Sequence, residues 1–327
     1  MPRWISEAIR LAVLAALLLA PVAATAAPAR RIMRVALPGG TMLGYYIATT
    51  PASVRSILIG VQGYVRDANR TWDAAAKAVA DAGHADDTLV VAPIFAVAAP
   101  EAQRCQYHGV PEAAPGDALW HCGNWSGGAP AGNDPRVTSF TAMDTLIAAL
   151  AREFPTARRI TVAGFSAGGQ YVQRYAAFAA PPPAGVHLRF VVADPSSFLY
   201  FDPERPQPGI AACPSYNRWK FGTEALPPFL GRSAAAARAT YADADLSYLE
   251  GSLDRDAGPG TAYRNLARNC AAELQGPFRL QRGLAYAAYD KAKLAHGAHP
   301  LTIVPGCAHS VSCVFPAPAA RAALFGN

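Results

Sequence analysis

Serine, aspartate and histidine occur in that order in the second half of the chain, each at the end of an apolar, strand-like run. Ser166 lies in the stretch GFSAG, Asp254 ends the stretch GSLD, and His309 ends the stretch GCAH. A serine hydroxyl is a poor nucleophile until a neighbouring base removes its proton. His309 can act as that base near neutral pH, and Asp254 can fix the imidazole tautomer and stabilise the imidazolium. We therefore predict a nucleophile, an acid and a base in these three residues.

The glycines around Ser166 support a sharp turn between a strand and a helix. A nucleophile on such a turn has strained dihedrals and crowds the positions two residues away, where Gly164 and Gly168 lie. The pattern Gly-x-Ser-x-Gly arises by chance in about one chain of this size in ten. The downstream acid and base, and not the five letters alone, therefore carry the prediction.

Two other aspartates compete with Asp254 for the role of the acid. Asp256 lies two residues further on, and Asp194 ends the preceding strand-like run, where it could also cap a turn before Pro195. We favour Asp254 because a short turn separates it from its strand, which is the placement that a strand-end acid needs. Glu250 lies inside the strand pattern, and we interpret it as structural.

His309 is favoured as the base because it follows the last predicted strand. Ligands gather at the carboxyl ends of parallel strands, whereas His296 and His299 precede that strand. The other competing histidines are His84, His108, His121 and His187.

Strand-like and helical patterns alternate along the chain, which predicts a mostly parallel sheet with helices on both faces. The first two runs, joined by Gly39-Gly40, are typical of an antiparallel hairpin. The expected strands lie within the stretches 30–38, 41–49, 54–63, 87–95, 158–165, 186–195, 244–254 and 299–309, and the first three expected helices are 71–83, 136–154 and 167–179.

The segments near 96–135 and 195–241 are expected to be irregular insertions of a single domain that spans 27–327. Loops of this length are usually functional or cross-linked. We expect Trp120, Trp125 and Tyr107 to pack a small core of the first insertion, with an acyl pocket as the alternative. The stretch SAAAARAT near the end of the second insertion is expected to be an ordinary helix.

The six cysteines all lie beyond residue 100, and their even number favours disulfides in an exported protein. We favour the pairs Cys105–Cys122, Cys213–Cys270 and Cys307–Cys313, the outer two because they are near neighbours. Alternatively, Cys105 and Cys122 could join His108 and His121 in a four-ligand zinc site. The oxidising compartment favours the disulfide, so we expect no metal.

Residues 1–26 have the order of a secretory signal peptide: a charged start, an apolar run from Leu11 to Ala20, and an A-x-A site ending at Ala26. We therefore expect a secreted or periplasmic protein, with no stable membrane insertion after signal cleavage, since no later segment reaches about 18 uncharged apolar residues. The formal net charge of +6 is scattered, without the basic stripe that is typical of nucleic-acid binding.

The stretches GFSAG, GSLD and GCAH, together with the strand order, make the chain resemble the α/β-hydrolase superfamily, in the neighbourhood of secreted bacterial esterases and polyester depolymerases. The resemblance covers most of the chain after residue 26. It implies an α/β-hydrolase fold, a nucleophile at Ser166, an acid at Asp254 and a base at His309, and no cofactor.

An oxyanion hole for this chemistry needs two backbone N–H donors. Ala167, directly after the nucleophile, is expected to supply one. Tyr64 is expected to supply the other, from the Gln62-Gly63-Tyr64 turn, where many hydrolases have His-Gly instead.

These residues favour an exported serine hydrolase that cleaves small or polymeric carboxylic esters through an acyl-enzyme. The same machinery cleaves amides, so an amide, polyester or polyamide backbone is an alternative substrate. A non-catalytic binding protein on the same scaffold is a further alternative, and the intact serine, aspartate and histidine argue against it.

Overall fold

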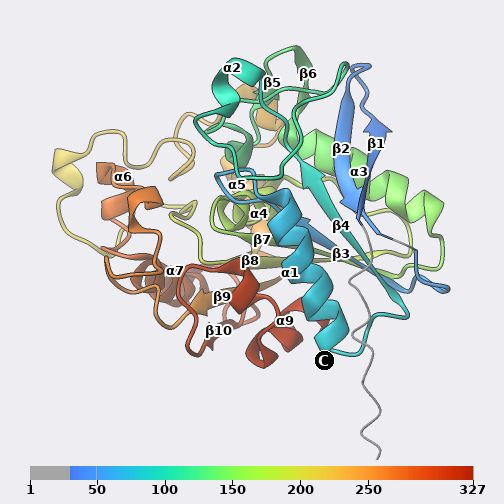
Figure 1. Ribbon diagram of the computed structural model, residues 1–327. Helices are drawn as coiled ribbons and strands as arrows, with labels where there is room; N and C mark the ends of the chain where they lie inside the picture. Colours follow the sequence, from blue (N-terminus) through green and yellow to red (C-terminus); the bar gives the residue numbers. More distant parts are fainter. Residues whose placement is uncertain (1–29, 49, 327) are drawn as a thin grey trace, which may run out of the picture.

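An eight-stranded sheet organises the computed structural model, which describes residues 30–48 and 50–326 (Figure 1). The expected signal peptide, 1–26, lies outside the described residues. The strand order is β1-β2-β4-β3-β7-β8-β9-β10. The strands are β1 (Arg31–Ala36), β2 (Met42–Ile47), β3 (Ser56–Val61), β4 (Thr88–Ile94), β7 (Arg159–Phe165), β8 (His187–Ala193), β9 (Asp245–Gly251) and β10 (Leu301–Val304).

The sheet is parallel from β4 to β10, whereas β1 and β2 form an antiparallel hairpin whose second strand runs antiparallel to β4. The expected mostly parallel sheet with an N-terminal hairpin is confirmed. The central strands carry nearly continuous apolar residues, and every residue of β4 is buried. Such strands need a cover on both faces.

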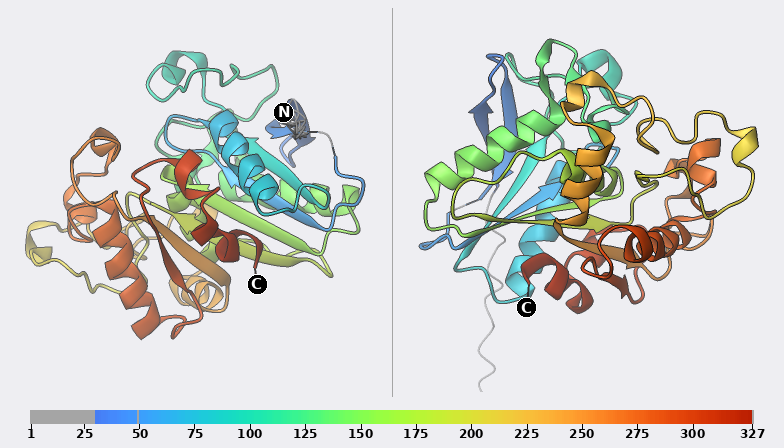
Figure 2. Two further views of the ribbon diagram at one scale, coloured as in Figure 1. Left: turned by 60° about the horizontal axis from the view of Figure 1, so that its bottom comes forward. Right: turned by 180° about the vertical axis from the view of Figure 1, so that it is seen from behind.

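Helices cover the two faces of the sheet, as Figure 1 and the two views of Figure 2 show. On one face, α1, α8 and α9 close a core that includes Trp72, Val314 and Leu324. On the other face, α3, α4, α5 and α7 close a larger core that includes Tyr171 and Tyr286. The helices are α1 (Ala68–Asp81), α2 (Ala99–Ala102), α3 (Ser139–Glu153), α4 (Ala167–Phe178), α5 (Ala234–Ala242), α6 (Cys270–Glu273), α7 (Arg279–Lys293), α8 (Val311–Val314) and α9 (Arg321–Phe325).

Two helices begin at other residues than the sequence predicts. Helix α1 starts at Ala68, three residues before Thr71, and the Thr71 amide already donates to the Asp67 carbonyl. Helix α3 starts at Ser139 because the preceding residues form β6 (Asp134–Thr138), which pairs with β5 (Pro130–Ala131). The Thr138 side chain then caps the helix by accepting from the Thr141 amide.

The tryptophans of the first insertion lie in the main core. Trp125 stacks on Phe95 with ring centroids 5.1 Å apart, and Trp120 meets the same ring edge-on at 5.3 Å. Both indoles are buried, so they fill the interior and leave no room for an acyl chain among them. The stretch SAAAARAT lies in α5, an ordinary helix that packs on α4.

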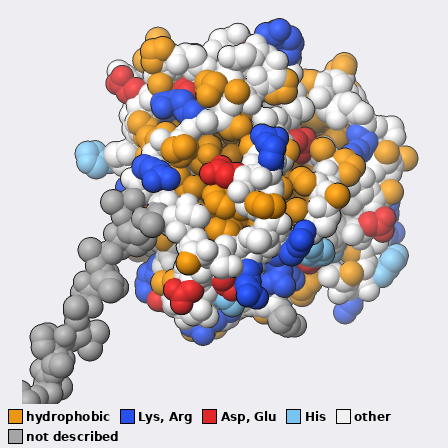
Figure 3. Space-filling view, turned by 90° about the vertical axis from the view of Figure 1, so that its right-hand side faces the viewer, with side chains coloured by type: hydrophobic (Ala, Val, Ile, Leu, Met, Phe, Trp, Pro, Cys, Tyr) orange, Lys and Arg blue, Asp and Glu red, His pale blue; other side chains and the backbone are white. Residues whose placement is uncertain are grey.

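Basic, acidic and apolar side chains are mixed on the face drawn in Figure 3, the right-hand side of Figure 1, and the basic ones gather toward its lower part without a stripe across it. Within 30–48 and 50–326, no helix combines the length and the apolar character that crossing a membrane requires.

Candidate functional site

Ser166 lies at a tight turn between β7 and α4. Its φ of 60° and ψ of −117° are strained for a residue with a side chain. The turn is possible because the neighbouring glycines have no Cβ: one on Gly164 would lie 2.1 Å from the Gly168 carbonyl oxygen, and one on Gly168 would lie 2.3 Å from the Val61 carbonyl oxygen. The start of α4 also directs positive dipole toward the Ser166 hydroxyl.

Gly169 is a third glycine on which this turn depends, and sequence reasoning missed it. A Cβ there would lie 2.5 Å from the Ala193 carbonyl oxygen at the end of β8. The same carbonyl oxygen accepts the Ser166 amide at 2.9 Å. The signal was present as the second glycine of GG in GFSAGG, but its partner on β8 is distant in sequence.

The structure brings Ser166, His309 and Asp254 together in one hydrogen-bonded chain. His309 Nε2 lies 2.9 Å from Ser166 Oγ, and His309 Nδ1 lies 2.6 Å from Asp254 Oδ2. The three residues follow β7, β10 and β9, so they meet at the carboxyl edge of the parallel strands. With the Nδ1 proton donated to Asp254, Nε2 is free to accept the serine proton.

The competing acids are engaged elsewhere. Asp194 Oδ1 accepts the Gly251 amide at 2.8 Å, and Asp256 Oδ1 accepts the Gly258 amide on the surface. Neither is hydrogen-bonded to His309 among the described contacts. The geometry therefore singles out Asp254 as the partner of His309.

Arg279 holds Asp254 in place and was not anticipated from the sequence. Its Nη1 lies 3.3 Å from Asp254 Oδ1 and donates to the Thr261 carbonyl oxygen at 2.7 Å, and both side chains are buried. Removing one partner of a buried ion pair is usually far more costly than the net worth of the pair. Arg279 is the first residue of α7, 25 positions after Asp254, and no local pattern links the two.

Two further buried carboxyl groups, Asp194 and Glu250, lie beside this ion pair. Asp194 Oδ2 and both carboxyl oxygens of Glu250 have no hydrogen-bond partner among the described residues. Burial raises the pKa of Asp194 to about 7, and burial together with the charge of Asp194 raises the pKa of Glu250 well above its usual range. The raised pKa values favour a proton on this pair, and one shared proton would pair Asp194 Oδ2 with one Glu250 oxygen. Glu250 lies within β9, as the strand pattern predicts.

Burial is the main cause that lowers the pKa of His309, while its hydrogen bond to Asp254 opposes the shift. A lowered pKa keeps the imidazole neutral, which is the form that can accept a proton. Of the other histidines near the last strand, His299 is buried between Asp290 and the Ala244 carbonyl oxygen, away from Ser166.

The expected oxyanion donors flank the serine. Ala167 is the first residue of α4, and Tyr64 lines a pocket of about 100 Å³ together with Ser166 and His309. Among the hydrogen bonds of the described residues, neither of these two backbone amides donates to a protein acceptor. The turn before Tyr64 is fixed by the Gly63 amide, which donates to Asp67 Oδ1 at 2.6 Å.

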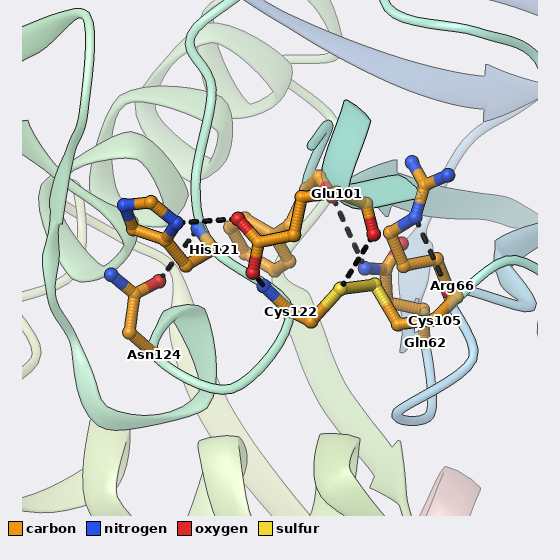
Figure 4. The surroundings of a disulfide bond; sticks show 8 residues. Gln62, Arg66, Glu101, Cys105, His121, Cys122 and Asn124 are labelled. Atoms are coloured by element: carbon orange, nitrogen blue, oxygen red, sulfur yellow. Dashed lines mark hydrogen bonds and ion pairs between the residues drawn. A yellow bond between two sulfur atoms is a disulfide. The ribbon is translucent and has the colours of Figure 1, made fainter. Parts of the chain in front are cut away.

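The structure contains the disulfides Cys105–Cys122, Cys213–Cys270 and Cys307–Cys313, the pairs favoured from the sequence. Figure 4 shows the first of them, with His121 directed toward Glu101 and Arg66 on the opposite side. The four-ligand zinc arrangement is not formed, because Cys105 and Cys122 are bonded to each other and His121 Nδ1 lies 2.5 Å from Glu101 Oε2. The Cys307–Cys313 bridge brackets His309 in sequence.

No protein-family model and no curated protein sequence matches the chain. Among solved structures, it is similar to poly(aspartic acid) hydrolase-1 from Sphingomonas sp. KT-1, with 19% identity and a TM-score of 0.61 over 91% of this chain and 99% of that one. It is also similar to LpqC, a poly(3-hydroxybutyrate) depolymerase from Bordetella parapertussis, with 20% identity and a TM-score of 0.59 over 87% and 86% of the two chains. The chain therefore has the α/β-hydrolase fold.

Proposed function

We propose that the chain is an exported serine hydrolase that cleaves carboxylic esters through an acyl-enzyme. Ser166 attacks the ester carbonyl carbon, and His309 takes the serine proton and then donates it to the departing alcohol. Asp254 stabilises the imidazolium, and the Tyr64 and Ala167 amides stabilise the oxyanion. Water then attacks the acyl-enzyme with His309 again as the base. The chain of hydrogen bonds at 2.9 and 2.6 Å is the observation that carries this proposal.

Export is part of the proposal. The signal-peptide pattern of 1–26 and the three disulfides are the features that support a secreted or periplasmic location.

The proposal is tested by comparing Ser166→Ala with wild type on p-nitrophenyl butyrate. We expect turnover to be lost in the variant while the circular dichroism spectrum stays unchanged. Ser215→Ala, which removes an exposed serine outside the site, is the matched control and should retain full activity. A fluorophosphonate probe should label wild type and not Ser166→Ala. Undiminished turnover in Ser166→Ala would contradict the proposal, and an unlabelled wild type would favour a non-catalytic binding protein.

A second candidate keeps this machinery and changes the bond to an amide or a polymer backbone. The two similar structures are described as a poly(aspartic acid) hydrolase and a poly(3-hydroxybutyrate) depolymerase, which makes polymers a rational part of the test. The purified protein should therefore be assayed on matched esters and amides and on soluble and insoluble polymers. Faster release from an amide or a polymer than from the matched small ester would favour this candidate.

A further inference from the structure

Arg70 lies in the first turn of α1 and lines the same small pocket as Ser166 and His309. No step of the proposed hydrolysis uses a guanidinium group. The pocket is also lined by Tyr64 and Asn265, so Arg70 contributes its positive charge to an otherwise mostly neutral wall.

The guanidinium group is fastened to the segment that follows the histidine. Arg70 Nη2 lies 3.2 Å from Ser310 Oγ, and Nε lies 3.3 Å from Ser312 Oγ. The Tyr107 ring flanks the group, with its centroid 6.0 Å from the guanidinium carbon. These contacts orient a side chain that would otherwise be long and mobile, and they leave Nη1 without a hydrogen-bond partner among the described residues.

Within residues 30–48 and 50–326, no direct ion pair neutralises the charge of Arg70. The ion pairs of the described residues do not include Arg70. The acidic residue that lines the pocket, Asp67, is buried and accepts the Gly63 amide. Burial raises the pKa of its carboxyl group, while the Gly63 hydrogen bond and the charge of Arg70 oppose this rise. Burial is the main cause that lowers the pKa of His309, and the charge of Arg70 adds the smallest of the contributions.

We propose that Arg70 binds a carboxylate carried by the substrate, so that the enzyme prefers anionic esters to neutral esters of the same size. This inference rests on the proposed hydrolase function. A guanidinium group matches a carboxylate with two parallel hydrogen bonds, and such charge-assisted bonds are stronger than neutral ones. We expect a preference of about tenfold in kcat/KM, the effect of one such contact.

Two pairs of substrates test the preference and show on which side of the ester the carboxylate lies. The acyl pair is p-nitrophenyl hydrogen adipate and its methyl ester. The alcohol pair is p-(butanoyloxy)benzoate and its methyl ester. In each pair the measured quantity is the ratio of kcat/KM for the anionic ester to kcat/KM for the neutral one, at mildly alkaline pH, where carboxylates are ionised. The ratio cancels any general loss of activity in a variant.

We expect wild type to show a ratio above one in at least one pair, corrected for the reactivity of each ester toward hydroxide. Arg70→Gln should lower that ratio about tenfold, and Arg70→Lys should retain more of it than Arg70→Gln. Arg55→Gln is the matched control, since it removes the same charge from an exposed arginine that lines a shallow depression where the parallel strands begin. It should leave the ratio unchanged.

A ratio that is unchanged in Arg70→Gln in both pairs would overturn the inference, as would an equal fall in Arg55→Gln, which would point to long-range attraction. Turnover of all four esters without any preference would overturn this inference alone. Absence of turnover with all four would contradict the proposed hydrolase function, and this inference with it.

Discussion

Phe165 packs its ring against the imidazole of His309, with ring centroids 4.6 Å apart and planes inclined at 36°. Phe165, the residue before Ser166, therefore shields the imidazole of His309 from water. The side chain of His309 is only 7% exposed, although the neighbouring Tyr64 is 39% exposed. The end of β7 thus supplies both Ser166 and part of the apolar wall around His309, and burial is the main cause that lowers the pKa of this imidazole.

The pH dependence of kcat/KM should reflect this wall. Because the folded pKa of His309 is lowered, the imidazole stays neutral as the pH falls, and the acidic limb should have its midpoint below 6.5. Phe165→Leu should admit water and move the midpoint upward. The measurement is kcat/KM for a neutral ester across the acidic range, and a wild-type midpoint at or above 6.5 would show that burial does not control the base.

Removing the Cys307–Cys313 disulfide should affect activity more than stability. The bridge closes a short loop with a sequence separation of 6, and short loops gain little chain entropy from closure. The bridge brackets His309, so its loss should lower kcat between about tenfold and a hundredfold through misplacement of the base. The variant is Cys307→Ser with Cys313→Ser, measured by ester turnover and by urea unfolding.

Cys213→Ser with Cys270→Ser is the matched control, because Cys213 lies in a separate small apolar cluster with Ala271 and Leu274, and the bridge has a sequence separation of 57. It should cost more unfolding free energy, in the range of about 2–5 kcal/mol, and less kcat. If both double variants lost activity in proportion to stability, the histidine-positioning role of Cys307–Cys313 would be wrong.

The fold and the strand-end positions of Ser166, Asp254 and His309 could be predicted from the sequence, because each depends on local patterns. Nearly continuous apolar runs predict buried parallel strands, and the edge where they end is common to all of them. Ser166, Asp254 and His309 could therefore be placed at one edge without knowledge of any side-chain contact. Their roles remain predictions until they are tested.

The surroundings of Ser166, Asp254 and His309 could not be predicted, because they depend on partners that are distant in sequence. Arg279 reaches Asp254 across an irregular segment, and Gly169 meets a carbonyl oxygen of another strand. Arg70 was missed because it lies just before the helix expected over 71–83, whereas α1 starts at Ala68. Asp67, which begins that helix, was missed with it.

The stability of the protein should fall with rising pH through the Asp194–Glu250 pair. Both folded pKa values are raised, that of Asp194 to about 7, so the stability that these protonated groups provide is fully present below their unfolded pKa values and is lost as the pH rises through 7. Helix α7 packs closely against Glu250, since a Cβ on Gly283 would lie 2.1 Å from Glu250 Oε1.

Glu250→Gln should reduce this loss, because the amide donates to Asp194 at every pH. Between about pH 5 and pH 9, the unfolding free energy of wild type should fall by on the order of 2 kcal/mol more than that of Glu250→Gln. The measurement is urea denaturation of both proteins across this range. Glu153→Gln, which replaces an exposed glutamate, is the control and should follow wild type. Identical pH dependence in Glu250→Gln and wild type would mean that the two carboxyl groups do not share a proton.

Asp67 should affect catalysis through the backbone that it holds. Its Oδ1 accepts the Gly63 amide at 2.6 Å, and this contact fixes the turn that presents the Tyr64 amide to the pocket. Asp67→Ala should lower kcat by up to about a hundredfold, the cost of losing one oxyanion donor, with a smaller change in KM. Asp67→Asn keeps an acceptor oxygen at the same place and should recover most of the loss.

Because removal of a buried carboxyl group also changes stability, both variants are compared at a temperature where circular dichroism shows them folded. Equal kcat values in wild type and Asp67→Ala under those conditions would exclude Tyr64 as a donor that depends on this turn.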